Sequence, residues 1–172
     1  NMPEFGIGSH TFNELFGATG NAWDPQVSAG GSSGGAAVAL AQRLLPIADG
    51  SDFMGSLRNP AGWNHVFALR PSQGRVPVDL VDDLWVSQLG TDGPMARTVA
   101  DLARLLDIQA GYDARAPLSM RDRFDSTLTP AKLGGLVIGW LGDLDGHLAY
   151  EPHIDEVCRE ALGVLGAAGA RI

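Results

Sequence analysis

The sequence predicts an α/β fold in which helices cover both faces of a mixed β-sheet. Residues 99–110 and 152–168 carry apolar side chains at the spacing of a helix that is buried along one side. Residues 45–48 and 133–141 are short apolar runs that indicate buried strands. Helices that alternate with short buried strands are typical of a sheet covered by helices.

The first half of the chain begins with loops and one short predicted helix. Thr11 and Glu14 have the spacing of a capping box, so we expect a helix over residues 12–16 that Gly17 ends. Residues 36–45 are small and apolar on all sides, which predicts a buried helix. Pro46 cannot continue this helix, and the strand at residues 45–48 follows.

Residues 61–97 are predicted to be mostly irregular, because glycine and proline interrupt them repeatedly. Aspartates within this segment are interpreted as a solvated acidic loop rather than as metal ligands. Its aromatic residues are candidates either for the core or for a substrate pocket. The aspartates are Asp79, Asp82 and Asp83, and the aromatic residues are Trp63, Phe67 and Trp85.

In the second half, Thr98 and Asp101 form a Thr-x-x-Asp capping pattern for the helix over residues 99–110. Pro152 lies in the first turn of the last predicted helix, and Gly169 ends it. Cys158 lies on the apolar stripe of that helix and is therefore predicted to be a core residue. Residues 170–172 resemble the beginning of another strand.

The composition is that of a soluble globular protein, with 172 residues, 45% of them hydrophobic and 19% charged. The net charge of −8 argues against nucleic acid or an anionic membrane as a partner. No apolar run approaches the roughly 18 residues of a membrane span, and no signal peptide is visible. A single cysteine excludes an internal disulfide and fits a reducing compartment. Without a membrane span or signal peptide, the expected location is the cytoplasm by default.

Two glycine-rich turns that carry serine are the candidate reactive centre. The first is Gly-Gly-Ser-Ser-Gly-Gly with Ser32 and Ser33, and the second contains Ser56, which follows Ser32 by 24 residues. Glycines allow close approach of the backbone to a substrate and leave N–H groups free to bind an oxyanion. A helix and a strand between the turns have room to bring Ser56 back beside Ser32.

The first turn alone admits other interpretations. A glycine-rich loop before a helix can bind phosphate, but the lysine of a P-loop is missing here. The segment also matches Gly-x-Ser-x-Gly, the nucleophile elbow of α/β-hydrolases, with Ser32 or Ser33 at its centre. That elbow requires a preceding strand, and residues 21–26 have the composition of a loop. A purely structural turn is the third alternative.

The two turns together resemble the amidase signature family, whose second turn reads Asp-x-x-Gly-Ser-x-Arg-x-Pro. The resemblance implies that Ser56 is the nucleophile and that Ser32, after a cis peptide bond, relays protons to a lysine. It also implies an oxyanion hole from backbone N–H groups, structural support beside it, and neither metal nor organic cofactor. The hole involves Phe53, Met54, Gly55 and Ser56, and the support comes from Ser33, Asp52 and Arg58.

The resemblance covers nearly all of residues 1–172 and implies a single amidase domain whose N- and C-terminal parts are missing. The family lysine precedes the first serine turn, whereas the only lysine here is Lys132. We therefore expect the 172 residues alone to be inactive. The histidines match no base of the family; they are His10, His65, His147 and His153.

The implied reaction is hydrolysis of a small-molecule amide. The alternatives are the amide-hydrolysing subunit of a tRNA-dependent amidotransferase and a scaffold that has lost the chemistry. The sequence leaves the identity of the amide open, and it also leaves open whether the chain forms a homo-oligomer. Phe53 and Met54 depart from the usual Asp-Thr-Gly-Gly-Ser pattern, and we expect their bulk to reshape the substrate pocket.

Overall fold

A computed structural model describes residues 1–78, 89–129, 131–151 and 153–172. The chain divides into two compact units, Asn1–Leu128 and Thr129–Ile172. Both serine turns lie in the first unit. All three aspartates assigned to an acidic loop lie outside the described residues, and so do Trp85 and Pro152.

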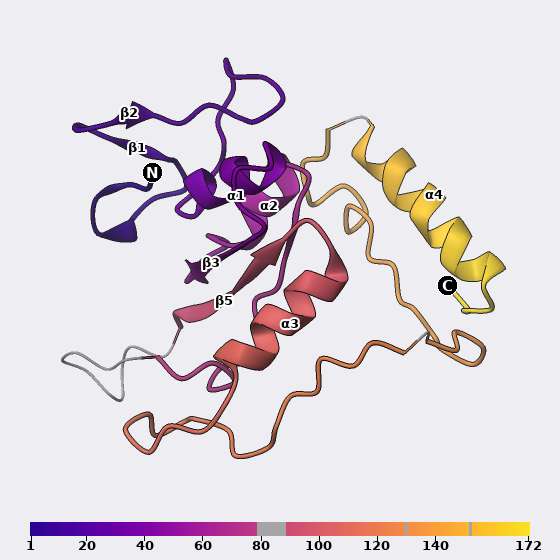
Figure 1. The fold of residues 1–172 in the computed structure, drawn as a ribbon. Helices are drawn as coiled ribbons and strands as arrows, with labels where there is room; N and C mark the ends of the chain where they lie inside the picture. Colours follow the sequence, from indigo (N-terminus) through magenta and orange to yellow (C-terminus); the bar gives the residue numbers. More distant parts are fainter. Residues whose placement is uncertain (79–88, 130, 152) are drawn as a thin grey trace. The chain divides into compact units, whose positions relative to one another are not determined.

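The first unit contains a small β-hairpin and a three-stranded antiparallel sheet (Figure 1). Strand β5 lies between β3 and β4, and its six residues pair with all six of β3, from Ile47 with Ala96 to Asp52 with Thr91. The elements of this unit, in chain order, are η1 (Glu4–Gly6), β1 (Phe12–Asn13), β2 (Gly17–Ala18), α1 (Gly34–Ala41), β3 (Ile47–Asp52), α2 (Arg58–Trp63), β4 (Phe67–Ala68), β5 (Thr91–Ala96) and α3 (Val99–Gln109).

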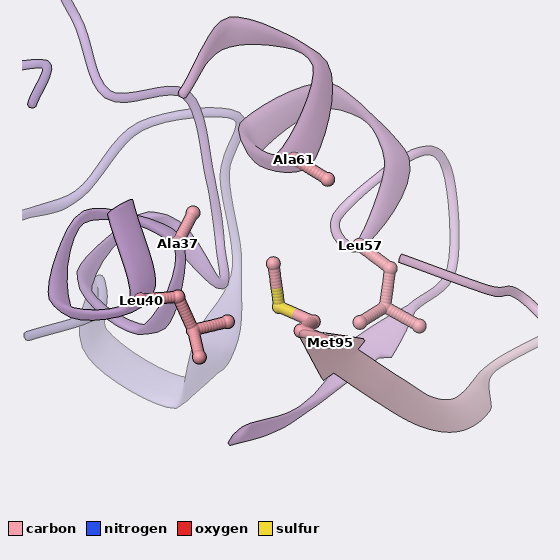
Figure 2. Close-up of a cluster of buried hydrophobic side chains, with 5 residues drawn as sticks. All are labelled: Ala37, Leu40, Leu57, Ala61 and Met95. Carbon is pink, nitrogen blue, oxygen red and sulfur yellow. The ribbon is translucent and has the colours of Figure 1, made fainter. Parts of the chain in front are cut away.

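A compact hydrophobic cluster joins α1 and α2 to the central strand. Leu40 from α1, Leu57 before α2 and Met95 from β5 are fully buried, and Ala37 and Ala61 complete the cluster. Their side chains point toward one another between the two helices and the strand (Figure 2). Burying a side chain of this size contributes roughly 1.5–3 kcal/mol. The cluster therefore fixes the two helices that follow the two serine turns.

Helix α3 forms as predicted. The Thr98 hydroxyl accepts a hydrogen bond from the backbone N–H of Asp101 (3.1 Å), so the capping interaction is present. Leu102, Ala103 and Leu106 form its buried face, and the helix packs along β5 (Figure 1).

The helix predicted for residues 12–16 is wrong, because these residues form the β1–β2 hairpin. Phe12 pairs with Ala18, and Asn13 pairs with Gly17. The side-chain carbonyl of Asn13 accepts hydrogen bonds from the N–H groups of Leu15 and Phe16 (3.1 and 2.8 Å) and closes the turn. Side chains of this kind compete with the backbone bonds of a helix.

The central part of the sheet also differs from the prediction. The expected strand at residues 45–48 is displaced to Ile47–Asp52, and it carries the chain directly to Asp52. Residues 61–97, predicted to be mostly irregular, contain β4 and the central strand β5. Pro94 is tolerated there because β4 pairs only with Met95 and Ala96.

The second unit contains α4 (Ile154–Ala167), which confirms the last predicted helix. Cys158 on this helix is half-buried. The strand predicted at residues 133–141 is wrong for the described residues, where Val137 forms one parallel bridge with Arg171. Val137 is 64% exposed, so the segment does not form a buried strand. No helix among residues 1–78, 89–129, 131–151 and 153–172 is long and apolar enough to cross a membrane.

Candidate active site

The two serine turns are joined by a direct backbone hydrogen bond. The N–H of Ser33 donates to the carbonyl oxygen of Ser56 over 3.2 Å. Ser33 is also the N-cap residue of α1, and Ser56 lies two residues before α2. After α1, strand β3 leads the chain back to the second turn, and α1 packs against α2. These two features bring together turns whose serines, Ser32 and Ser56, are 24 residues apart in the sequence.

Ser32 is buried, with 1% of its surface exposed, and it lines a cavity of about 440 Å³. Among the described residues, its hydroxyl has no hydrogen-bond partner. Ser33, Asp49, Ser51 and Asp92 also line this cavity. Burial, together with the neighbouring carboxylate of Asp49, raises the pKa of Asp92.

The first serine turn is in close contact with His10 and Thr11. The Thr11 hydroxyl donates a hydrogen bond to the Gly30 carbonyl (2.7 Å). A methyl group at Gly31 would lie 2.1 Å from the His10 carbonyl oxygen, so only glycine fits at this contact. The peptide bond between Gly31 and Ser32 is cis. Local spacing predicts a helix cap at Thr11, and only the folded chain reveals its contact with the turn.

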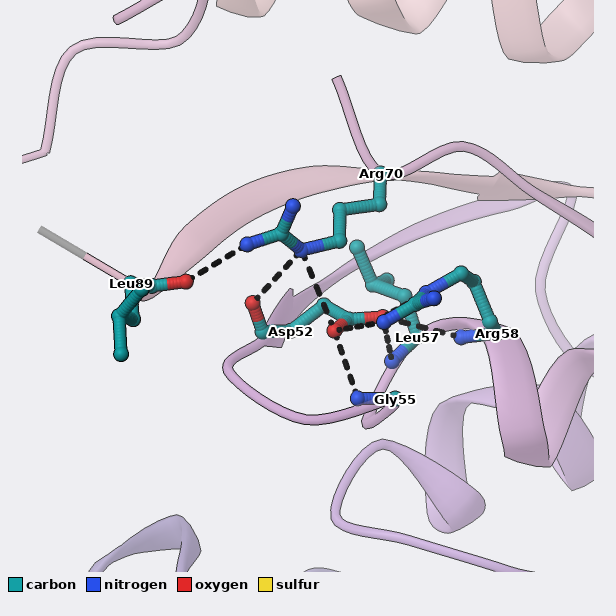
Figure 3. A network of polar contacts seen from close by, with 6 residues as sticks. All are labelled: Asp52, Gly55, Leu57, Arg58, Arg70 and Leu89. Atoms are coloured by element: carbon teal, nitrogen blue, oxygen red, sulfur yellow. Dashed lines mark hydrogen bonds and ion pairs between the residues drawn. The ribbon is translucent and has the colours of Figure 1, made fainter. Parts of the chain in front are cut away.

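Asp52 stabilises the second turn through hydrogen bonds to its backbone. Its side chain is fully buried, and its carboxylate accepts hydrogen bonds from the N–H groups of Gly55 (2.7 Å) and Leu57 (3.2 Å). The Arg58 guanidinium binds both carboxylate oxygens at 2.9 and 3.0 Å. Figure 3 shows this network around the turn that carries Ser56.

A second arginine, Arg70, reaches the same carboxylate at 3.3 Å. Its guanidinium also donates to the backbone carbonyls of Asp52 and Leu89 at 3.2 and 2.7 Å (Figure 3). Sequence reasoning assigns support to Asp52 and Arg58 and misses Arg70. No local pattern could have identified it, because the contact joins residues that are 18 positions apart.

The network keeps Asp52 ionised. Burial alone would raise the pKa of this carboxyl, but the hydrogen bonds from Arg58 and from backbone N–H groups outweigh it and lower the pKa to about 2. The same contact raises the pKa of the Arg58 guanidinium. Asp52 therefore serves as a permanent anion that fixes the turn rather than as a proton carrier.

The four residues expected to supply oxyanion donors differ in their availability. The N–H of Gly55 already donates to Asp52, whereas those of Phe53, Met54 and Ser56 make no hydrogen bond among the described residues. The left-handed backbone conformation falls on Gly55 (φ 113°) and not on Met54. The side chains of Phe53 and Met54 are 56% and 80% exposed.

Asn64, at the end of α2, is a positioning residue that sequence reasoning also misses. It is fully buried, and its amide donates 2.8 Å hydrogen bonds to the carbonyls of Ala29 and Pro60. Its side-chain carbonyl accepts from the N–H of Ala22 (2.9 Å). Asn64 thereby ties the segment entering the first serine turn to the helix that follows the second.

The other candidate bases do not gather at the serines within the first unit. His10 is exposed, and its Nδ1 accepts a hydrogen bond from the N–H of Phe12 (3.3 Å). His65 makes an edge-on ring contact with Trp23, with centroids 6.4 Å apart. The remaining three candidates lie in the second unit; they are Lys132, His147 and His153. In the described part of the chain, no three His, Cys, Asp or Glu side chains are grouped to hold a metal ion.

The fold of this chain recurs in solved structures. A bacterial aryl acylamidase of the amidase signature family matches 99% of this chain with a TM-score of 0.90 and 34% identity. The match covers 35% of that enzyme. A 6-aminohexanoate cyclic dimer hydrolase, solved with its substrate, matches with a TM-score of 0.84 and 31% identity, over 99% of this chain and 36% of that one. These similarities confirm the predicted α/β class as the amidase signature fold.

The family model named Amidase matches residues 1–172, and the chain belongs to the amidase signature family. An acylamidase of Rhodococcus erythropolis is 40% identical over the whole chain and 36% of its own length. A glutamyl-tRNA(Gln) amidotransferase subunit of Chromohalobacter salexigens is 39% identical over the whole chain and 35% of its own length. The chain thus spans about a third of the length of these relatives.

Proposed function

We propose that the protein hydrolyses the C–N bond of a small-molecule carboxylic amide through a serine acyl-enzyme. The observation that carries this proposal is the backbone hydrogen bond between Ser33 and Ser56, which holds the turn of the buried Ser32 against the turn of the half-buried Ser56. Membership of the amidase signature family supports it.

In the first half-reaction, the Ser56 Oγ attacks the amide carbon and its proton passes to the Ser32 Oγ. Ser32 gives its own proton to the base at the same time. The proton then returns through Ser32 to the amide nitrogen, the C–N bond breaks, and ammonia or an amine leaves. In the second half-reaction, water loses a proton by the same route and attacks the acyl carbon. Ser56 departs and recovers its proton.

The oxyanion of each tetrahedral intermediate is assigned to backbone donors of the second turn. The N–H groups of Phe53, Met54 and Ser56 are the available ones, while the N–H of Gly55 holds Asp52. Asp52, Arg58 and Arg70 fix the turn before substrate arrives, so little reorganisation is needed when the negative charge develops.

The base is assigned to a lysine outside these 172 residues, reaching Ser32 through the cavity that Ser32 lines. Serine is a weak nucleophile unless a base takes its proton. We therefore expect the 172 residues alone to turn over amides only at a small residual rate. Activity of this segment comparable to that of the full-length protein, lost on Lys132→Ala, would contradict the assignment.

A second candidate function is the amide-hydrolysing step of a tRNA-dependent amidotransferase. It is favoured by the relatives described as glutamyl-tRNA(Gln) amidotransferase subunits, which are 39–41% identical over nearly the whole chain. Affinity purification of the tagged protein from its native cells separates the two candidates. Recovery of a stoichiometric second subunit favours the amidotransferase, and recovery of the protein alone favours the free amidase.

Hydroxamate trapping with the full-length protein tests the chemistry itself. Hydroxylamine intercepts an acyl-enzyme, so an active amidase converts a simple amide into a hydroxamate that ferric ion detects. The matched control is Ser56→Ala, which should give none. If a set of aliphatic and aryl amides yields no hydroxamate with folded wild-type protein, the chain is a scaffold that has lost the chemistry.

A further inference from the structure

A second cavity, of about 640 Å³, opens on the first unit among the ends of several elements. Arg43 follows the C-terminal end of α1, His65 follows α2, and Phe67 belongs to β4. Arg97, just before α3, and Trp23 complete the lining used in this argument. We call these five residues the cationic pocket. None of them lines the cavity at Ser32.

The charge of the cationic pocket is of one sign. Two arginines line it, and the described residues of its lining include no aspartate or glutamate, although the whole chain has a net charge of −8. Asp101, close by at the start of α3, already shares a 2.8 Å hydrogen bond with the Thr98 hydroxyl. A concentration of uncompensated cations in an acidic chain attracts an anion.

The two arginines retain free donors. The Arg43 side chain has no hydrogen-bond or ion-pair partner among the described residues. Arg97 uses one terminal nitrogen, Nη1, which donates to the carbonyls of Leu40 (3.0 Å) and Leu45 (2.5 Å). This contact anchors the guanidinium at the end of α1, and its other N–H groups have no partner in the described part of the chain. A guanidinium group can bind a carboxylate or a phosphate through two parallel N–H···O hydrogen bonds.

The pocket also offers flat apolar surface beside these donors. Trp23 is 67% exposed and Phe67 is 49% exposed. The indole N–H of Trp23 donates to the backbone carbonyl of Asn64 (3.0 Å), and this hydrogen bond holds the ring in place. Ligand pockets combine this kind of aromatic lining with a few charged groups and have volumes of roughly 300–1,000 Å³.

We propose that the cationic pocket binds a small organic anion in which a carboxylate, phosphate or sulfonate is attached to an aromatic body. The anionic head lies between Arg43 and Arg97, and the aromatic body packs against Trp23 and Phe67. The site differs from the serine centre in both location and chemistry, because an amide substrate is uncharged at its reacting group.

Isothermal titration calorimetry of the full-length protein with 2-naphthyl phosphate tests this assignment, with neutral 2-naphthol as the matched ligand. We expect one binding site for the phosphate and at least about tenfold weaker binding of the alcohol, since a charge-assisted hydrogen bond contributes on this scale. Arg43→Gln should weaken binding of the phosphate about tenfold, and Arg43→Glu should weaken it further.

Arg104→Gln is the matched control, because Arg104 is an exposed arginine of α3 that does not line the pocket. It should bind 2-naphthyl phosphate like the wild type. The proposal is overturned if the wild type shows no binding heat, if 2-naphthol binds as tightly as the phosphate, or if both Arg43 variants retain wild-type affinity. Thermal unfolding of each variant shows that it is folded, and Arg43 is exposed and makes no side-chain hydrogen bond or ion pair with the described residues whose loss would unfold it.

Discussion

The backbone N–H of Ser33 donates a hydrogen bond to the carbonyl oxygen of Ser56 (3.2 Å), which links the two serine turns. Because the link is made by the backbone, a side-chain substitution at Ser33 leaves it in place. Ser32, the preceding residue, is buried and lines the cavity of about 440 Å³. The proposed mechanism therefore gives the two adjacent serines separable roles, with the backbone of Ser33 positioning the turn and the hydroxyl of Ser32 relaying protons.

Ser32→Ala should lower kcat for amide hydrolysis by about 10²–10⁴-fold in the full-length protein, because it removes the hydroxyl that the proposed mechanism uses to carry protons from Ser56. Slow acylation of Ser56 should remain. Ser33→Ala, as the matched comparison, should cost much less, since its contribution comes from the backbone. Steady-state kinetics on one amide check both variants. An equal loss in the two variants, or a larger loss in Ser33→Ala, would remove the relay role from Ser32.

Asp52→Asn should lower the free energy of unfolding by about 1–3 kcal/mol, because the N–H groups of Gly55 and Leu57 lose a charged acceptor in a buried place. Urea denaturation of the full-length protein measures this change. Activity should fall as well, since the turn that carries Ser56 loses its anchor. A variant with wild-type stability would show that Arg58 and Arg70 hold the turn without the carboxylate.

Acid should lower the free energy of unfolding, in part because it protonates the carboxylate of Asp52. The pKa of Asp52 is about 2 in the folded state and about 3.9 in an unfolded chain, so its contribution is complete above pH 4 and is lost between about pH 4 and pH 2. The contribution is about 2–3 kcal/mol. The stability difference between wild type and Asp52→Asn should shrink as the pH falls through this window.

Asp113→Asn is the control for the acid experiment, because Arg115 also lowers the pKa of Asp113 to about 2 but the pair lies on the surface. Surface ion pairs contribute little to stability. A loss of stability with acid that depends on Asp113 as strongly as on Asp52 would contradict the importance of burial at Asp52.

How far the sequence predicts this structure depends on whether the decisive contacts are local. Helix α3 was predictable because Thr98 caps it from within its own first turn. Strand β5 was not, because Gly93 and Pro94 locally favour a break, and only pairing with β3 holds them extended. The helix cap predicted at Thr11 is wrong for the same reason, since its hydroxyl binds Gly30 across 19 positions rather than its own turn.

The residues of the candidate site also differ in whether a local sequence pattern predicts them. The serines and Asp52 carry recognisable spacing, and Arg58 follows within the same turn. Arg70 and Asn64 complete the site through contacts between residues that are 18 to 42 positions apart in the sequence. No periodicity or motif indicates such contacts. The partners of a buried polar group therefore become visible only when the chain is folded.

Two glycine substitutions provide a matched test of the packing around the first turn. Gly31→Ala places a methyl group 2.1 Å from the His10 carbonyl oxygen and should prevent the turn from forming, with loss of activity and stability. Gly62→Ala in α2 meets no atom within 4 Å and should be neutral or stabilising by up to about 1 kcal/mol. Thermal unfolding of the two full-length variants checks the contrast, and similar melting temperatures would refute it.

The most direct measurement of the central claim is covalent labelling of the full-length protein by a serine-reactive fluorophosphonate probe, followed by peptide mapping. We predict one labelled residue, Ser56, and no labelling of Ser56→Ala, while circular dichroism shows that this variant keeps its fold. Ser32→Ala should still be labelled, but slowly. Full labelling of Ser56→Ala, or a label mapped to Ser33, would contradict the account and place the nucleophile in the first serine turn.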